Sequence, residues 1–395
     1  MDQSREERVF TEKLCSVNGL NGSIGLNLID YFGSAEKVFE ADDKTLSSLL
    51  TPGLFANLSR AKKDLSHAGL LSQNGNTENR IHFITIWDEE YPKKLLDIPD
   101  SPLGLWYKGS LPDEELPSVA VIGARECSEY GEAVAKNIGI AMGQAKVQVI
   151  SGMARGIDGI SQQAALSEGG RSFAVLGSGA DICYPPSNKK LYDSLSERGG
   201  IISLYPPGEP AVPKNFPPRN RIVSGLADAV IVIEARQKSG TLITVDMALE
   251  QGREVYAVPG RITDRLSDGC NGLIGQGAGI FLSPDIFLAE LSELRSATKS
   301  NNPLPEPEKK IKRSSLSKRI EKLHRTFSGS TENLTDLSED AINVLSRLDL
   351  SPKSAQDILN RLEGYDYPTV SMILMQLVIE GHASQVGQGN YVRKY

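Results

Sequence analysis

The sequence predicts an α/β protein whose central domain is a Rossmann-like, doubly wound and mostly parallel sheet. Short runs rich in Val and Ile alternate with helix-length segments, and most of these runs end in Gly or Pro. Their apolar residues are almost continuous, which is typical of strands buried on both faces and therefore of parallel sheets. The chain of 395 residues is long enough for such a core and for two or three domains. The runs lie at 118–125, 147–158, 172–179, 200–208, 228–235 and 254–261.

The composition is that of an ordinary globular protein, with 39% hydrophobic and 24% charged residues. No stretch approaches the roughly 18 apolar residues of a membrane span, and the charged start MDQSREERVF argues against a secretory signal. The four cysteines form no CxxC pair, so we expect reduced thiols in a cytoplasmic protein, with neither a disulfide framework nor a zinc site. The net charge of −7 argues against a protein that coats nucleic acid indiscriminately, but it leaves room for a local basic groove.

The N-terminal part, residues 1–78, is expected to form a small helical domain. Leu26, Ile29 and Phe32 recur at helical spacing between glycine breaks. The turn GLNGSIG at 19–25 resembles a helix-hairpin-helix, in which amides at the start of a helix can meet a phosphate. A plain packing module and a DNA-contacting module are both open here, and the sequence favours packing.

The sheet domain is placed at 79–295, and two further segments follow it. Residues 296–332 form a basic linker rich in Pro, Ser and Lys, which is either a solvated spacer or an electrostatic contact to nucleic acid. The pattern of residues 333–395 predicts three short helices and a hairpin, which is typical of a winged helix. The third helix, within 369–380, has no Lys or Arg, and such cations dominate the affinity of DNA-reading helices. We therefore expect this domain to contact protein or to serve a structural role.

Three glycine-rich turns follow strands of the predicted sheet, and they form the candidate site. Ligands of such sheets bind at the carboxyl ends of the strands, and amides at a helix start hold phosphates. No turn matches GxGxxG, and no acidic residue stands where dinucleotide-binding proteins have the carboxylate that binds the ribose hydroxyl. The sequence therefore argues against a dinucleotide cofactor. The candidate residues are Gly123 and Arg125 in the first turn, Ser151, Gly152, Arg155 and Gly156 in the second, and Ser239, Gly240 and Thr241 in the third.

A fourth candidate segment, VPKNFPPRNRIVSG at 212–225, adds cations and an aromatic residue. Guanidinium forks bind phosphate chains bidentately. Phe216 either stacks on a base or belongs to the core, and core is the commoner role for a lone Phe. The candidate residues here are Lys214, Phe216, Arg219, Asn220 and Arg221, with Lys189 upstream in YPPSNKK.

No catalytic or metal-binding set can be assembled from these residues. All four histidines, at 67, 82, 324 and 382, fall outside the turns and the 212–225 segment. Asp158 follows the second turn and fits an orienting partner for an arginine or a helix-start amide better than a catalytic acid. We therefore expect a site that holds phosphates without cleaving them, with no cofactor and no metal.

Several stretches together resemble the DNA-processing protein A family (DprA/Smf), and they run in family order across 91–279. They are YPKKLLDIPDSPLGLWYKG, VAVIGAR, SGMARGID, YPPSN, FPPRNRIVSGLADAVIVIEA, SGTLITVDMALEQGREVYAVPG and DGCNGLIGQGA. The resemblance implies a bacterial cytosolic protein that binds and protects single-stranded DNA and loads the RecA recombinase during natural transformation. It also implies a homodimer that contacts no membrane and is not an enzyme.

The resemblance further implies which residues line the DNA groove. In the family these are the arginine of the first glycine turn and nearby basic residues, which carries over onto Arg125, onto Arg155, and onto Lys214 and the 219–221 segment. One position departs from the family pattern: Gln162 stands where members usually have a histidine. Glutamine still offers a donor and an acceptor, so we expect binding to survive.

Two alternatives to a DNA-binding mediator remain open. One is a nucleotide-cleaving hydrolase of the lysine-decarboxylase-like type, whose glycine-threonine helix start the stretch SGTLITVDMALE resembles. That type carries an acid soon after the threonine, and this chain has none there. The other is a sensor that binds a free nucleotide in the sheet domain.

Overall fold

The computed structural model describes residues 5–67, 81–299, 338–348, 353–362, 364–380, 382–385 and 390–393. The chain divides into two compact units, Met1–Leu304 and Pro305–Tyr395. Helix α12 (Pro284–Lys299) continues four residues past the start of the predicted linker. The rest of that linker, 300–332, lies outside the described residues, and the proposed domain boundaries stay a prediction.

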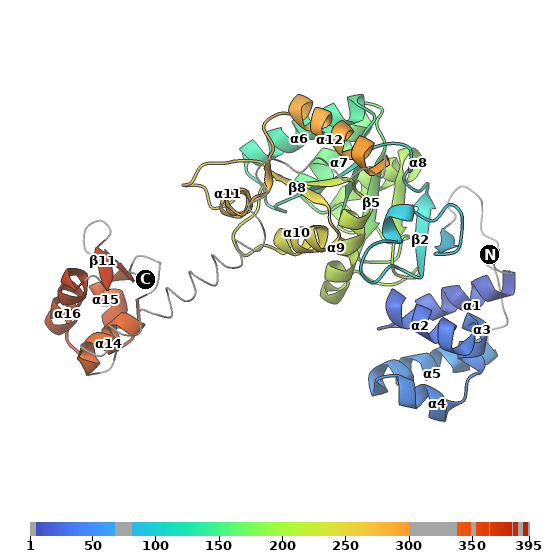
Figure 1. Ribbon diagram of the computed structural model, residues 1–395, viewed down its shortest axis with the longest axis horizontal. Helices are drawn as coiled ribbons and strands as arrows, with labels where there is room; N and C mark the ends of the chain where they lie inside the picture. Colours follow the sequence, from blue (N-terminus) through green and yellow to red (C-terminus); the bar gives the residue numbers. More distant parts are fainter. Residues whose placement is uncertain are drawn as a thin grey trace. The chain divides into compact units, whose positions relative to one another are not determined.

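The first unit is built on a mixed, mostly parallel sheet, which confirms the predicted fold class (Figure 1). Within the described residues it has nine strands, in the order β1-β2-β6-β5-β4-β3-β7-β8-β9. The pairs from β6 to β9 are all parallel, whereas β2 pairs antiparallel with β1 and with β6. The strands are β1 (His82–Thr85), β2 (Gly104–Gly109), β3 (Ser118–Ile122), β4 (Gln148–Ser151), β5 (Ser172–Leu176), β6 (Gly200–Ser203), β7 (Ala229–Val232), β8 (Glu254–Ala257) and β9 (Gly279–Ile280).

Helices cover both faces of the sheet, and this explains the continuous apolar runs. In β3, Val119 and Val121 pack into the core under α6, α7 and α12, while Ala120 and Ile122 pack into the core under α9, α10 and α11. Because side chains alternate along a strand, a strand covered on both faces must be apolar at every position. The helices are α6 (Glu129–Gln144), α7 (Ile157–Ser167), α8 (Lys189–Arg198), α9 (Phe216–Gly225), α10 (Gly240–Glu250) and α11 (Asp268–Gly275).

The strand order reverses beside β3, and this places the ligand crevice. The chain runs from β3 outward through β4 and β5 to β6, and then crosses to β7 on the other side of β3. The loops that follow β3 and β7 therefore leave the sheet in opposite directions. A crevice opens between such loops at the carboxyl ends of the strands.

The predicted N-terminal helices are present as α1 (Arg5–Cys15), α2 (Gly22–Phe32), α3 (Ala35–Glu40), α4 (Asp43–Leu49) and α5 (Pro52–His67). At the turn that resembles a helix-hairpin-helix, the Asn21 side chain accepts from the amide of Ile24 at 2.8 Å. The Asp100 carboxylate accepts from the amide of Ser23, also at 2.8 Å. A carboxylate of the protein thus occupies the place where a phosphate would meet this helix, which supports the packing interpretation.

Asp100 also binds Arg221, and a substitution there tests this junction. Arg221 Nη2 lies 3.2 Å from Asp100 Oδ2, and Asp100 has a φ of 55°, which Asn tolerates. Asp100→Asn keeps an acceptor for Ser23 but removes the ion pair. We expect the free energy of unfolding to fall by about 1–2 kcal/mol in a urea titration. Asp97→Asn, at an exposed carboxylate of the same loop, should change it little, and equal losses from both variants would contradict this account.

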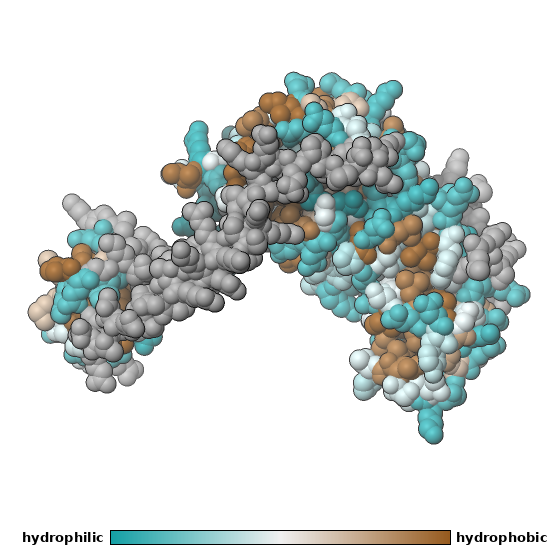
Figure 2. Space-filling view, viewed as in Figure 1, coloured by the Kyte–Doolittle hydropathy of each residue, from teal (hydrophilic) through white to brown (hydrophobic). Residues whose placement is uncertain are grey.

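One edge of the sheet ends in the short strand β9 and exposes apolar side chains. Ile280, Leu282 and Ile286 are 46%, 68% and 46% exposed. Figure 2 shows hydrophobic side chains on the surface near α11 and α12. An unpaired edge strand with exposed apolar neighbours is a surface that tends to be covered by a partner.

Among its described residues, the second unit has three helices and a small antiparallel sheet of order β10-β12-β11. Its elements are α14 (Glu339–Ser346), β10 (Lys353–Ser354), α15 (Ala355–Leu359), α16 (Tyr367–Ile379), β11 (Ala383–Gln385) and β12 (Asn390–Arg393). The helices and the β11–β12 hairpin agree with the pattern predicted from the sequence, while the winged-helix assignment stays a prediction. In the described part of the chain, no helix is long and apolar enough to span a membrane.

Candidate functional site

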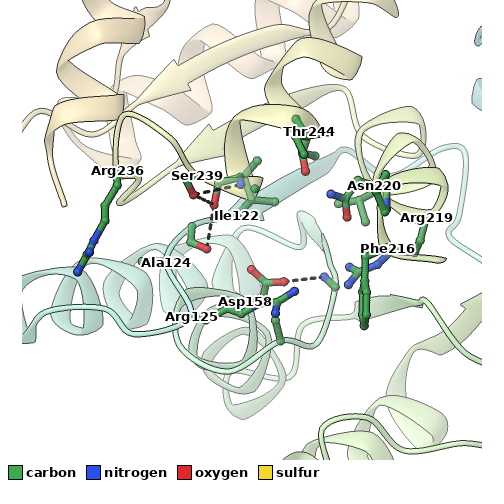
Figure 3. A pocket seen from close by; sticks show the side chains of 18 of the residues that line it. Ile122, Ala124, Arg125, Asp158, Phe216, Arg219, Asn220, Arg236, Ser239 and Thr244 are labelled. Atoms are coloured by element: carbon green, nitrogen blue, oxygen red, sulfur yellow. Dashed lines mark hydrogen bonds between the residues drawn. The ribbon is translucent and has the colours of Figure 1, made fainter. Parts of the chain in front are cut away.

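A cavity of about 740 Å³ opens at the carboxyl ends of β3, β4 and β7, beside the point where the strand order reverses. We call it the main cavity (Figure 3). It brings together most of the residues predicted from the three glycine turns and the 212–225 segment. Those that line it are Gly123, Arg125, Gly152, Phe216, Arg219, Asn220, Ser239, Gly240 and Thr241.

A smaller side cavity of about 60 Å³ adjoins the main cavity. The lining residues that the two share are Arg125, Gly152, Ala154, Tyr184, Phe216 and Arg219. The side cavity adds the predicted Arg155, which is exposed, and reaches the turn after β5. Because they share these residues, the walls of the two cavities are continuous around Phe216.

The turn after β4 is shaped by contacts inside the protein. The Ser151 hydroxyl is buried and donates to the Val121 carbonyl at 2.6 Å, and Ser151 lines neither cavity. Gly156 precedes α7 as its N-cap with a φ of 72°, and a Cβ there would lie 2.3 Å from the Ala124 carbonyl oxygen. These two predicted residues therefore shape the turn.

Asp158 lies under this turn and binds it. Its Oδ2 accepts from the amide of Gly152 at 3.1 Å, as expected for a partner of a main-chain amide. Burial raises the pKa of this carboxyl, while the nearby Arg219 acts in the opposite direction. The amide of Met153 donates to Gln162 Oε1 at 3.1 Å. Two amides of the turn are thus engaged inside the protein and are not available to a ligand.

Arg219 is the buried cation of the site. It is only 5% exposed, lines both cavities, and its Nε has no hydrogen-bond partner within the described part of the chain. Burial lowers the pKa of its guanidinium to about 10, with the Asp158 carboxylate opposing the shift, so Arg219 is cationic at neutral pH. A desolvated guanidinium with an unpaired donor binds an anion more strongly than an exposed one.

Arg125 and Arg219 both lie next to the aromatic ring of Phe216. Their Cζ atoms lie 5.5 and 5.7 Å from the centroid of the Phe216 ring, within the range of cation–π contacts. Tyr184, which lines both cavities, has its ring centroid 5.8 Å from that of Phe216. Cations beside aromatic faces suit a single nucleic acid strand, because phosphates meet the cations and bases stack on the rings.

The third turn closes the opposite side of the main cavity. The Ser239 hydroxyl accepts from the amide of Thr241 at 3.2 Å and caps α10. The Thr241 hydroxyl donates to the Gly123 carbonyl at 3.2 Å and so joins the third turn to the first. The positive end of the α10 dipole therefore lies at the cavity.

Two lining cations were missed from the sequence, namely Arg236 and Lys238. Figure 3 places Arg236 across the cavity from Arg219. Both precede the Ser-Gly-Thr turn directly in EARQKSGT, and that adjacency is the signal that could have found them. The lining carboxylates are Glu126 and Asp158, so Arg125, Arg219, Arg236 and Lys238 leave it net positive although the whole chain carries −7.

Three predicted cations lie outside both cavities. Lys214 and Arg221 line a separate hollow of about 560 Å³ next to the N-terminal helices. Lys214 Nζ lies 3.3 Å from Asn18 Oδ1, and Arg221 is paired with Asp100. Lys189 pairs with Asp193 on α8 and also lies beside the ring of Tyr192. The structure therefore does not bring these three to the main cavity.

Two buried side chains support the site: Glu234 carried no distinct sequence signal, whereas Gln162 stood out only as the departure from the family pattern. Glu234, fully buried after β7, accepts from the amide of Ser128 at 2.9 Å and also from its hydroxyl, and Ser128 caps α6 after the first turn. Gln162 uses both its donor and its acceptor in hydrogen bonds. Among the residues that the structure describes, no cluster of three His, Cys, Asp or Glu side chains could hold a metal ion.

The matching family model and the curated relatives agree on one family. Residues 82–292, just over half of the chain, match the family described as DNA recombination-mediator protein A. The DNA processing protein DprA of Streptococcus pneumoniae is 44% identical over 206 residues, which cover 52% of this chain and 73% of that protein. The Smf protein of Escherichia coli is 42% identical over 211 residues, 53% of this chain and 56% of the relative.

A solved structure extends the likeness beyond the matched segment. The X-ray structure of DprA from Streptococcus pneumoniae superposes with a TM-score of 0.62 at 35% identity, covering 73% of this chain and 99% of that one. The matched segment contains both cavities and the three glycine turns. The chain belongs to the DNA recombination-mediator protein A family.

Proposed function

We propose that this chain is a recombination mediator that binds single-stranded DNA along the main cavity and the side cavity. The observation that carries the proposal is the buried, partly unpaired guanidinium of Arg219 beside Arg125 and the Phe216 ring. Arg219 and Arg125 would hold backbone phosphates, and Phe216 would stack on a base. Such contacts are sequence-tolerant, because every nucleotide offers a phosphate and a π-face.

The preference for a single strand follows from access to the bases. In a duplex the base faces are stacked on one another and cannot reach an aromatic ring inside a cavity. In a single strand they can turn toward Phe216 and Tyr184 while the phosphates stay near the guanidinium groups. Arg236, Lys238 and the start of α10 would continue the phosphate track on the opposite wall of the main cavity.

We further propose that the chain holds the strand without cleaving it and delivers it to RecA in the cytoplasm. A mediator must release its strand intact, and the lining hydroxyls of Ser239 and Thr241 bind each other and the Gly123 carbonyl instead of a base. We also propose a homodimer, supported by the apolar side chains of Ile280, Leu282 and Ile286 at the free β9 edge. Lys189, Lys214 and Arg221 stay candidate contacts for a longer strand that runs past the cavities.

The test is fluorescence anisotropy of a labelled oligothymidine at several salt concentrations. If about four phosphates are held, log affinity should fall with log salt at a slope of roughly −3, at about −0.7 per contact. Arg125→Ala should weaken binding about tenfold and bring the slope to about −2, because one charge-assisted contact is lost.

The matched control is Arg60→Ala, at an exposed arginine of α5 that lines neither cavity. It should leave both affinity and slope close to those of the unaltered chain. Equal effects of the two variants, or no binding by the unaltered chain, would overturn the proposed site. Release of free base from a nucleoside monophosphate would instead support the hydrolase alternative.

A further inference from the structure

The turn between β4 and α7 is strained at its centre. Met153 is a fully buried non-glycine residue with a φ of 52°, in the left-handed region. Such a conformation costs free energy and persists only where the surroundings hold it. Met153 lies between Gly152, which packs against Arg219, and Arg155, which lines the side cavity. The strained residue is therefore next to two parts of the candidate site.

Two side chains hold Met153 from both sides. Its amide donates to Gln162 Oε1 at 3.1 Å, and its carbonyl accepts from Asn188 Nδ2 at 2.9 Å. Asn188 Nδ2 also lies 3.2 Å from the Ala154 carbonyl oxygen. Both main-chain polar groups of the strained residue are thus satisfied by side chains.

Gln162 in turn is fixed to the sheet. It is fully buried on α7, and its Nε2 donates to the Phe173 carbonyl at 3.0 Å and to the Ser172 hydroxyl at 3.2 Å. One amide group therefore connects the turn to β5. Because both ends of the amide are used, the side chain has a single satisfied orientation.

We propose that Gln162 is a positioning residue for the binding site: it holds the Met153 turn in the strained shape that places Arg155 at the side cavity and leaves room for Arg219. This inference rests on the proposed function, since Arg155 matters only if the cavity binds a strand. Without the Oε1 acceptor, the buried amide of Met153 has no partner and the turn relaxes toward negative φ. Arg155 then leaves the side cavity while the sheet stays intact.

The chain offers a matched control at the other end of the same strand. Gln148 begins β4, is 1% exposed, and accepts from the amide of Asp113 at 2.8 Å. Its Nε2 donates to the carbonyls of Asp113 and Leu116 at 2.8 and 3.3 Å. Gln148 and Gln162 therefore match in residue type, burial and hydrogen-bonding pattern, but Gln148 lies at the amino end of the strand, away from the cavities.

The experiment compares Gln162→Met with Gln148→Met by oligothymidine anisotropy against salt, after thermal unfolding has shown that both fold. We expect similar losses of stability. Only Gln162→Met should weaken binding about tenfold and flatten the slope by about 0.7, as for one lost phosphate contact. Gln162→Glu keeps an acceptor for the amide of Met153, so its affinity for the oligothymidine should lie between those of Gln162→Met and Gln148→Met. Equal binding losses in both methionine variants would overturn the positioning role.

A double-mutant cycle with Arg155→Ala supplies the readout that a merely structural role would not move. If Gln162 acts through Arg155, the double variant Gln162→Met/Arg155→Ala should bind little worse than Arg155→Ala alone. If the two substitutions act independently, their losses of affinity would multiply, and that result would overturn the inference. Trypsin cleavage after Arg155 gives a second readout that needs no DNA, and it should rise in Gln162→Met but not in Gln148→Met. Faster cleavage without any DNA binding by the unaltered chain would defeat the proposed function and leave the role of Gln162 in the turn standing.

Discussion

Arg219→Lys is expected to weaken the binding of a single-stranded oligonucleotide by about a hundredfold while the protein stays folded. A buried guanidinium can present a bidentate fork to a phosphate, and a lysine ammonium cannot. Losing the charge-assisted hydrogen bonds of that fork costs about 3 kcal/mol, which corresponds to about a hundredfold in affinity. Lysine keeps a positive charge near Asp158, whose buried carboxyl would otherwise lose its neighbouring cation. Titration at fixed salt measures the affinity, and urea unfolding checks the fold.

Arg221→Lys is the matched control, since Arg221 lies two residues further along the same helix. It is held by Asp100 beside the N-terminal helices and lines neither cavity. With an oligothymidine short enough to stay within the two cavities, its substitution should change affinity less than threefold, well below the tenfold step that one charge-assisted bond makes. A larger effect of Arg221→Lys than of Arg219→Lys would place the strand in the hollow next to the N-terminal helices instead.

Gly152→Ala is expected to remove most of the affinity for single-stranded DNA that Arg219 contributes, because it displaces the Arg219 guanidinium. A Cβ at this position would lie 1.6 Å from Arg219 Nη1 and 2.6 Å from its Cζ, so the guanidinium must move. Because the obstacle is the end of a side chain, the fold should survive with a loss of about 1–3 kcal/mol. The displaced guanidinium no longer meets the phosphate, so we expect affinity to fall about as far as in Arg219→Lys. Anisotropy and urea unfolding of the same sample measure both effects.

Gly272→Ala is the matched control, because it adds the same methyl group at a position where the group meets no neighbour. Gly272 lies on α11, and a Cβ there would have no neighbour within 4 Å. That variant should bind like the unaltered chain and unfold no more easily. If Gly152→Ala also bound normally, Arg219 would not need its place against the turn, and the account of the buried cation would be wrong.

The fold class was predictable because its signal is local. Strands covered on both faces, such as β3 and β7, must be apolar at successive positions, and the glycine turns mark where the strands end. The antiparallel hairpin of β1 and β2 was not predicted. It joins the sheet at the edge, and its polar residues, such as His82 and Lys108, break the apolar pattern that identifies the central strands.

The arginines of RNR show where sequence proximity misleads. The sequence presents Arg219 and Arg221 as one cationic segment, but both residues lie on helix α9. Two residues apart on a helix corresponds to about 200° of rotation, at 3.6 residues per turn. Arg219 therefore faces the main cavity, and Arg221 faces Asp100.

By itself the sequence determined the sheet, the glycine turns at its strand ends and the residue types that suit phosphate and base. Each depends on neighbours along the chain, through alternation, turn conformation and helix-start amides. Only the tertiary structure decided which of these groups are available to a ligand. Asp158 and Gln162 occupy the amides of Gly152 and Met153, while burial leaves Arg219 with an unpaired donor. Those partners come from other elements, and hydrogen-bond competition between elements is settled only when the chain is packed.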